Sequence, residues 1–381
     1  MTRLAFAPAA FAIALGLVSM FGATAHYKGG PSALLLAGET TFVPAQYRPG
    51  VYLHPGIVGF DGQFYFLIAQ DPWIMSDRWR ALDLPLPRYQ RIFYPALGWI
   101  LSGGGAPSRL PVALLLANLL GLAAGALFVA RIAARLGRGP WEACGIGCLF
   151  PLFPGLIHAA TYCLTDVWAA ALVAGSLSMW LNGRARASVL FACLAALTRE
   201  ETLVYSTGFA LALAIRREKV RNVAAWFLPH AAYLLWVAYV SVRTGAHTLP
   251  FFQYTGTIGI PFVAVAKTVM RLASPAFHSP QSLIEAAYIL FLIGASFLAF
   301  RGLFAKGQLP PERVAFACEA AFQWFVSEWL WSNPANFLRL GCLLWVFALY
   351  RLAQGGSRVP IVLAILMAWA GPVFALRPWL F

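Results

Sequence analysis

The chain has 381 residues, of which 60% are hydrophobic and only 11% are charged, and its formal net charge is +14. A soluble domain of this size cannot bury so much apolar surface, so the composition indicates a polytopic membrane protein. The basic residues are scattered at the ends of apolar stretches rather than gathered in a stripe. This pattern is typical of cytoplasmic loops and makes nucleic acid an unexpected partner.

The first apolar stretch covers residues 4–24 and follows a single basic residue, Arg3. It is long enough to span a membrane, so we expect an uncleaved first helix. The alternative is a signal peptide that is cleaved after Ala25, because residues 23–25 resemble a signal-peptidase site.

A long polar and aromatic loop follows at residues 26–91, and within it lies the stretch GFDGQFY at residues 59–65. Asp61 is an acid among aromatic side chains and is the candidate catalytic base at the membrane face. The alternative is a purely structural role, with Asp61 capping a short helix and Phe60 packing against Tyr65. In either case a stripe on the bilayer surface is expected from Phe60, Phe64 and Leu67.

Two arginines stand near the end of the same loop, Arg88 and Arg91. One interpretation is contact with lipid headgroups, and the other is a role as phosphate ligands, for which the guanidinium fork is suited. Residues 92–102 are apolar but too few to span a membrane, so a re-entrant or interfacial helix is expected there.

Basic residues at the ends of the later apolar stretches set the orientation. The loops near 131–141, 183–187, 216–222, 301–313 and 352–358 are expected to face the cytoplasm. Residues 26–91, 161–166, 242–281 and 332–336 are then expected to face outward. The segment 188–215 lies between two basic clusters and is broken at Thr198-Arg199-Glu200-Glu201. We therefore expect two half-helices there, with the charged break facing a cavity.

The whole chain, residues 1–381, is thus expected to be a single all-α integral membrane domain of about nine to eleven transmembrane helices. Several acids and arginines map to its outer half together. They are Asp61, Asp166, Glu200, Glu201, Glu328, Arg88, Arg91, Arg199 and Arg339. Asp166 also has a structural alternative, as the cap of the helix that it begins.

An outward cavity with carboxylates, arginines and aromatic side chains suits sugar transfer from a lipid-linked phosphate donor. A carboxylate can take the proton of an acceptor hydroxyl, and arginines can hold the departing phosphate. Aromatic residues such as Tyr65 can line the sugar. The sequence has no nucleotide-binding or serine-hydrolase motif, and its cysteines and histidines show no ligand spacing.

Short motifs carry a family resemblance. FDGQFY is followed by IAQDP at residues 68–72 and by RYQRIFYP at residues 88–95. With the LTRE break at residues 197–200 and the NFLR turn at residues 336–339, these resemble the polytopic GT-C glycosyltransferases. The motif RYQRIFYP is similar to a bacterial branch of that superfamily. The acid-bearing loop is distantly like that of the GPI mannosyltransferases.

The resemblance implies a GT-C-like helical bundle, a catalytic Asp61, a polyprenyl-phosphate sugar donor and an inverting transfer. Many relatives carry a paired acid in this loop, whereas Asp61 is followed by Gly62-Gln63. A divalent metal is therefore unsupported and no cofactor is expected. Asp166 is the second candidate catalytic acid, and Arg88, Arg91, Tyr65, Arg199, Glu200 and Arg339 are the candidate substrate-binding residues.

The expected partners are a lipid-linked sugar donor, membrane lipids and an acceptor that is a glycan, a lipid or a protein. The expected location is the bacterial inner membrane, with the site facing outward. Two rival hypotheses remain: a transporter or flippase of lipid-linked sugars, and a structural membrane subunit. A transporter would be marked by paired discontinuous helices in two related halves, and the chain shows one broken pair and no repeat.

Overall fold

The computed structural model describes residues 6–40, 44–246, 258–273, 280–304, 309–331, 334–355 and 359–369. Within these ranges the chain is helical, and extended pairing is limited to isolated bridges. The expected class, an all-α polytopic membrane protein, is confirmed.

Five segments are long and apolar enough to cross a membrane on their own, and one bent pair raises the number to six. The five are Ala7–Tyr27, Leu110–Arg135, Val220–Thr244, Ser282–Leu303 and Asn336–Gln354. The corresponding helices are α1 (Ala7–Tyr27), α5 (Leu110–Arg135), α11 (Val220–Ala225) with α12 (Leu228–Thr244), α15 (Pro280–Leu303) and α18 (Pro334–Gln354).

The bent pair consists of α6 (Pro140–Leu149) with η4 (Phe150–Leu152) and α7 (Pro154–Thr161), at an angle of 60°. Four apolar helices are shorter: α8 (Asp166–Leu181), α9 (Ala185–Ala196), α10 (Thr202–Ile215) and α19 (Val359–Ala368). At 1.5 Å per residue none of these four reaches the roughly 30 Å of a hydrocarbon core. The described part of the chain thus holds fewer full-length spans than the nine to eleven expected.

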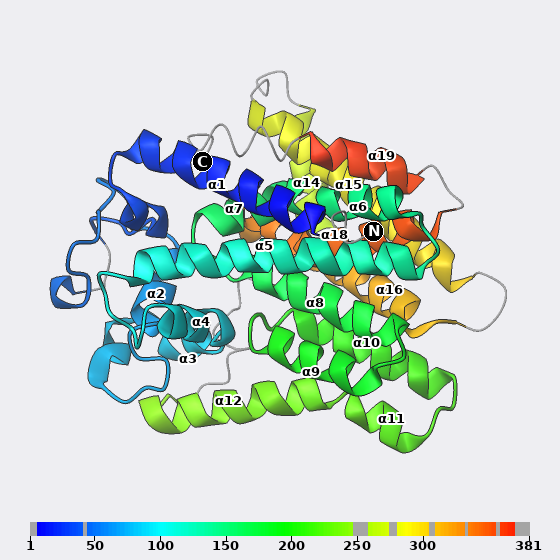
Figure 1. The fold of residues 1–381 in the computed structure, drawn as a ribbon, viewed down its shortest axis with the longest axis horizontal. Helices are drawn as coiled ribbons and strands as arrows, with labels where there is room; N and C mark the ends of the chain where they lie inside the picture. Colours follow the sequence, from blue (N-terminus) through cyan, green and yellow to red (C-terminus); the bar gives the residue numbers. More distant parts are fainter. Residues whose placement is uncertain are drawn as a thin grey trace.

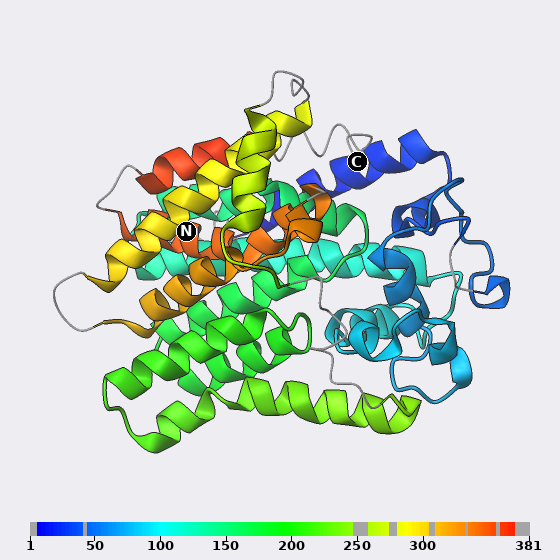
Figure 2. The ribbon, with the colours of Figure 1, turned by 180° about the vertical axis from the view of Figure 1, so that it is seen from behind.

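The long helices lie side by side along the long axis of the molecule, while α2, α3 and α4 gather at one end of it (Figure 1). We call this the α2–α4 end. The same grouping is visible from behind, where the chain that follows α1 gathers at that end (Figure 2).

Short elements fill the α2–α4 end. They are η1 (Pro31–Leu35), η2 (Ala45–Tyr47), α2 (Asp61–Ile68), η3 (Asp77–Ala81), α3 (Pro85–Tyr89) and α4 (Phe93–Leu101). The remaining helices are α14 (Val263–Leu272), α16 (Pro311–Gln323) and α17 (Glu328–Trp331). The helix α4 falls where the sequence predicts a re-entrant or interfacial helix, at residues 92–102. Residues 247–257 and 274–279 belong to the segment 242–281 that is expected to face outward, and they lie outside the described residues.

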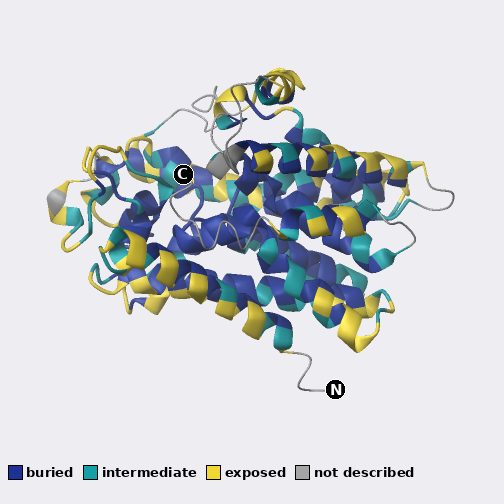
Figure 3. Cartoon of the chain, turned by 90° about the horizontal axis from the view of Figure 1, so that it is seen from above, coloured by how far each residue is buried: buried dark blue, intermediate teal, exposed yellow. Residues whose placement is uncertain are grey.

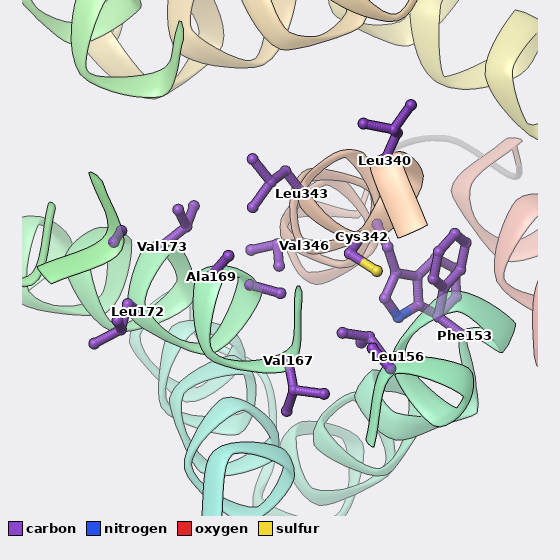
Figure 4. Close-up of a cluster of buried hydrophobic side chains, with 14 of the residues drawn as sticks. Phe153, Leu156, Val167, Ala169, Leu172, Val173, Leu340, Cys342, Leu343 and Val346 are labelled. Atoms are coloured by element: carbon purple, nitrogen blue, oxygen red, sulfur yellow. The ribbon is translucent and has the colours of Figure 1, made fainter. Parts of the chain in front are cut away.

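The core runs the length of the bundle, with buried residues along its interior and exposed ones on its surface (Figure 3). Figure 4 shows apolar side chains of α7, α8 and α18 meeting, among them Leu156, Val167 and Leu343. Glycines let some backbones approach closely: a Cβ at Gly155 would lie 2.3 Å from the carbonyl oxygen of Leu338. Small residues at helix contacts are typical of membrane bundles.

Large apolar side chains also cover the outside of the long helices. Phe21 on α1, Leu120 on α5, Leu235 on α12 and Phe297 on α15 are all exposed. A surface of this kind is expected when the solvent around the helices is lipid rather than water.

Candidate functional site

Asp61 is the first residue of α2, and Phe60 is the residue that caps it. The carboxylate of Asp61 contacts arginines rather than the amides of the first helical turn. The alternative in which Asp61 caps the helix is therefore wrong. The predicted surface stripe is wrong as well, because Phe64 and Leu67 are buried inside the protein.

Three guanidinium groups surround this carboxylate. Arg88 Nη1 donates to Asp61 Oδ1 at 2.7 Å, Arg339 Nη2 donates to Oδ2 at 3.2 Å, and Arg91 Nη1 lies 4.0 Å from Oδ2. Burial raises the pKa of Asp61, but the charges of Arg88, Arg339 and Arg91 outweigh it and hold the pKa well below its usual range. The carboxylate is thus ionised and strongly neutralised in this state.

Arg88 is positioned by α3, whose first residue is Pro85. Proline is well tolerated there, because the first N–H groups of a helix have no intrahelical partner. The guanidinium donates to both oxygens of Asp83, from Nε at 3.0 Å and from Nη2 at 2.8 Å. The guanidinium carbon of Arg88, Cζ, also lies 4.0 Å from the centre of the Phe64 ring. Arg88 is therefore shared between two carboxylates and an aromatic face.

Arg91 follows α3 and turns to the break between α9 and α10. It donates to both oxygens of Glu200, from Nε at 3.0 Å and from Nη2 at 2.5 Å. Its Nη1 also donates to the hydroxyl of Tyr65 at 3.3 Å. The break predicted at Thr198–Glu201 thus carries a residue of the site, since α9 ends at Ala196 and α10 begins at Thr202.

A second, deeper layer is built around Asp166, the first residue of α8. Its oxygens accept from Arg199 Nη1 and, at 3.0 Å, from Arg339 Nε. Arg199 in turn donates to Glu201 at 2.9 Å. The side chain of Asp166 is fully buried, whereas that of Asp61 is 21% exposed. The alternative of Asp166 as a helix cap is wrong, because the cap residue is Thr165 and the carboxylate is bound to arginines.

We call this set of side chains the acid–arginine cluster. It comprises Asp61, Asp83, Asp166, Glu200, Glu201, Arg88, Arg91, Arg199 and Arg339. Every candidate site residue from the sequence is in it or, in the case of Tyr65, touches it. Asp83 was missed as a site residue, although it stands five residues before Arg88. Glu201, which the sequence maps to the outer half with the other acids, belongs to the cluster. Glu328, mapped there as well, pairs with Lys267 instead.

The two layers are joined by Arg339 of α18, which lies between Asp61 and Asp166. The cluster therefore descends from an open edge at Asp61, Asp83 and Glu200 to a buried interior at Asp166 and Glu201. Among the described residues no three acidic, histidine or cysteine side chains are placed to hold a metal ion together.

Chemically, the open edge combines a carboxylate that can accept a proton with guanidinium groups that can bind a phosphate in two-point contacts. An arriving anion would have to compete with carboxylates for those arginines, because each of Arg88, Arg91, Arg199 and Arg339 is already bound to an acid. The arginines of the cluster therefore become available to an anion only when the anion displaces one of these carboxylates.

A protein-family model described as "Predicted membrane protein (DUF2079)" matches residues 109–303, which is slightly more than half of the chain. The matched range contains Asp166, Arg199 and Glu200 of the cluster, while Asp61 and Arg339 lie outside it. No curated protein matches the chain.

Proposed function

From the premise that the chain belongs to the DUF2079 family of predicted membrane proteins, we propose that it is a membrane-embedded glycosyltransferase. It takes a sugar from a polyprenyl-phosphate donor and passes it to an acceptor hydroxyl, with inversion. The active site is the open edge of the acid–arginine cluster, and it faces outward from the bacterial inner membrane.

One observation supports this proposal above the others: a partly exposed carboxylate, Asp61, lies directly against three arginines. A glycosyl transfer from a phosphate needs both partners at one place. It needs a base for the acceptor hydroxyl and cations for the leaving phosphate.

The proposed reaction is a single displacement. The acceptor oxygen forms a bond to the anomeric carbon while the bond between that carbon and the phosphate oxygen breaks. The hydroxyl proton passes to the Asp61 carboxylate, and the lipid phosphate leaves in contact with Arg88 or Arg91. No other reactant is required.

The resting contacts of Asp61 favour an order of events. A carboxylate that is neutralised by three guanidinium groups is a weak base. When a donor phosphate takes Arg88, Asp61 loses its shortest contact and becomes more basic. Donor binding therefore activates the base, while Arg339 stays in place because Asp166 holds it from behind.

The test uses the protein in proteoliposomes that contain short-chain polyprenyl-phosphate sugars. Mass spectrometry measures the release of lipid phosphate from these donors. We expect Asp61→Asn to fold and bind donor but to turn over about a hundred to ten thousand times more slowly, which is the usual cost of losing a general base. Asparagine keeps the size of the side chain and removes the proton acceptor.

The matched control is Asp77→Asn, since Asp77 lies in the same loop and forms only an exposed ion pair with Arg80. It should turn over like the parent. An Asp61→Asn protein with near-parental turnover would refute the base assignment. If the parent protein moves the donors across the bilayer and never releases lipid phosphate, the flippase alternative stands instead.

A further inference from the structure

Three arginines from three helices gather at the end of the bundle opposite to the α2–α4 end. Arg301 is in the last turn of α15, Arg313 is in the first turn of α16, and Arg351 is in the last turn of α18. Figure 2 shows the end of α15 and the start of α16 together at that end of the molecule. We call these three residues the basic triad. The proposed transfer takes place at the other end and does not use them.

Arg313 and Arg301 are brought together by the packing of α15 on α16. A Cβ at Gly302, the residue after Arg301, would lie 3.8 Å from Arg313 Cδ. The stem of Arg313 therefore runs beside the last turn of α15, next to the residue that carries the first guanidinium group.

Arg351 is connected to α16 by a chain of hydrogen bonds. Its Nη1 donates to Gln354 Oε1, and Gln354 Nε2 donates to the hydroxyl of Tyr350. That hydroxyl donates to Glu312 Oε1 at 2.9 Å, and Glu312 is the chain neighbour of Arg313. The charges of the other two arginines also act on Arg351.

The basic triad lacks anions to balance its charge. Within the described ranges, no ion pair includes any of its three members. The Nε atoms of Arg313 and Arg351 are buried and have no hydrogen-bond partner in the part of the chain that the structure describes. The neighbouring acid, Glu312, is itself buried, and one carboxylate against three guanidinium groups leaves a positive surplus. Buried donors on a cation are costly to leave unpaired, so the triad indicates that an anion binds there.

An exposed apolar stripe leads along α15 to the triad. Its members recur at spacings of three, four or seven residues, which places them on one face of the helix. They are Leu283, Leu290, Ile293, Phe297 and Phe300, and all of them are exposed. Arg301 lies four residues after Phe297 and is exposed on the same face. In a membrane the stripe faces acyl chains, and the arginine at its end lies at the level of the headgroups.

We propose that the basic triad and the α15 stripe bind one anionic diacyl phospholipid. The guanidinium groups hold the phosphate of the headgroup, for which their paired N–H donors are suited, and the acyl chains lie along the stripe. By the positive-inside rule this end faces the cytoplasm, so the lipid comes from the cytoplasmic leaflet. A zwitterionic phospholipid fits less well, because its ammonium group is repelled by the same arginines. The lipid site does not depend on the proposed function.

The experiment is a lipid titration of the full-length protein in detergent, with bound lipid counted by native mass spectrometry. The probes are phosphatidylglycerol and phosphatidylcholine with identical acyl chains. We expect phosphatidylglycerol to bind about a hundred times more tightly, because each of three arginines contributes roughly fivefold to the binding of an anionic lipid. Glycerol phosphate at the same concentration should not displace it, because this probe has no acyl chains.

Substitutions locate the phosphate. Arg313→Gln should weaken the binding of phosphatidylglycerol about fivefold and leave that of phosphatidylcholine unchanged. Arg301→Gln, at an exposed position, should do the same and decides the question if Arg313→Gln fails to fold. The matched control is Arg184→Gln, which removes an exposed arginine from the same end of the bundle and should bind both lipids like the parent.

A second pair of variants locates the acyl chains. Phe297→Ala should weaken the binding of phosphatidylglycerol, whereas Leu235→Ala, on the exposed surface of α12, should not. Equal affinity for the two phospholipids, or an equal loss in Arg184→Gln and in the triad variants, overturns the proposal. Displacement of the lipid by an equal concentration of glycerol phosphate would show a site for soluble phosphate and would overturn it as well.

Discussion

Asp61 and Asp166 both begin a helix and both bind arginines, but they differ in their access to a substrate. Asp61 is at the open edge, while Asp166 lies behind Arg339 with its side chain fully buried. Of the two candidate catalytic acids, only Asp61 is placed to touch a reacting hydroxyl. We therefore assign Asp166 the role of a positioning residue that holds Arg199 and Arg339.

These two roles predict different losses of stability when each aspartate is replaced by asparagine. Asp166→Asn leaves the buried guanidinium groups of Arg199 and Arg339 each with one carboxylate partner fewer, and removing one partner of a buried ion pair costs about 3–5 kcal/mol. We expect a clear drop in the thermal midpoint for Asp166→Asn and a smaller one for Asp61→Asn, measured in the same detergent. Equal stability of the two variants would contradict the positioning role of Asp166.

The lowered pKa of Asp61 gives a pH prediction. A carboxyl whose pKa is lower in the folded state than in the unfolded one stabilises the fold at all pH values above its ordinary pKa, near 3.9. That contribution is lost only as the pH falls through the lowered value. The carboxylate is therefore already ionised at neutral pH, and the acid limb of kcat/KM should lie at unusually low pH.

Arg88→Gln should move the acid limb of the kcat/KM profile to higher pH. Burial raises the pKa of Asp61, and the Arg88 charge is the largest of the three that lower it. The measurement is the pH profile of lipid-phosphate release, with Arg80→Gln as a control in the exposed part of the loop. An acid limb at the same pH in parent and Arg88→Gln would show that Asp61 is not the base.

At the level of the elements, α2 packs closely against two other backbone segments at its second residue, Gly62. A Cβ at this position would lie 2.7 Å from the carbonyl oxygens of both Leu35 and Tyr162. Backbone atoms cannot turn aside as flexible side chains can. Gly62, the residue directly after Asp61, is thus required for packing, and it fixes the start of α2 with Asp61 on it.

Gly62→Ala should therefore lower both turnover and the thermal midpoint, although alanine is the better helix former by about 1 kcal/mol. Gly145→Ala in α6 is the control, because an added Cβ there meets no atom within 4 Å. It should be neutral or slightly stabilising. A Gly62→Ala protein with parental turnover would show that the α2 backbone is free to shift.

The sequence predicts the helices well where apolar runs are long, as in α5, and it places the break between α9 and α10 correctly. It fails at the start of α2, because capping rules consider only local amides, whereas Asp61 binds side chains from α3 and α18. The ion pair between Arg339 and Asp61 joins residues 278 positions apart. Local patterns indicate which charges are candidates, but only the packed fold shows which of them are partners.

At the level of the whole molecule, basic residues mark the end of the bundle opposite to the acid–arginine cluster. Arg135 ends α5 and Arg184 lies between α8 and α9, while Asp61 and Arg88 occupy the α2–α4 end. By the positive-inside rule the basic end faces the cytoplasm, so the cluster is expected to open outward. A donor that is carried on the outward leaflet could then reach Asp61 without crossing the bilayer.

Single cysteines in a cysteine-free background test this orientation. Position 77, in η3 beside the cluster, and position 186, near the start of α9, are both exposed and belong to opposite ends of the bundle. In intact cells an impermeant maleimide should label Asp77→Cys and spare Arg186→Cys. After the membrane is permeabilised, both should react, which shows that position 186 is accessible in itself. Labelling of position 186 in intact cells would reverse the orientation and place the proposed transfer on the cytoplasmic side, where a different pool of donors is available.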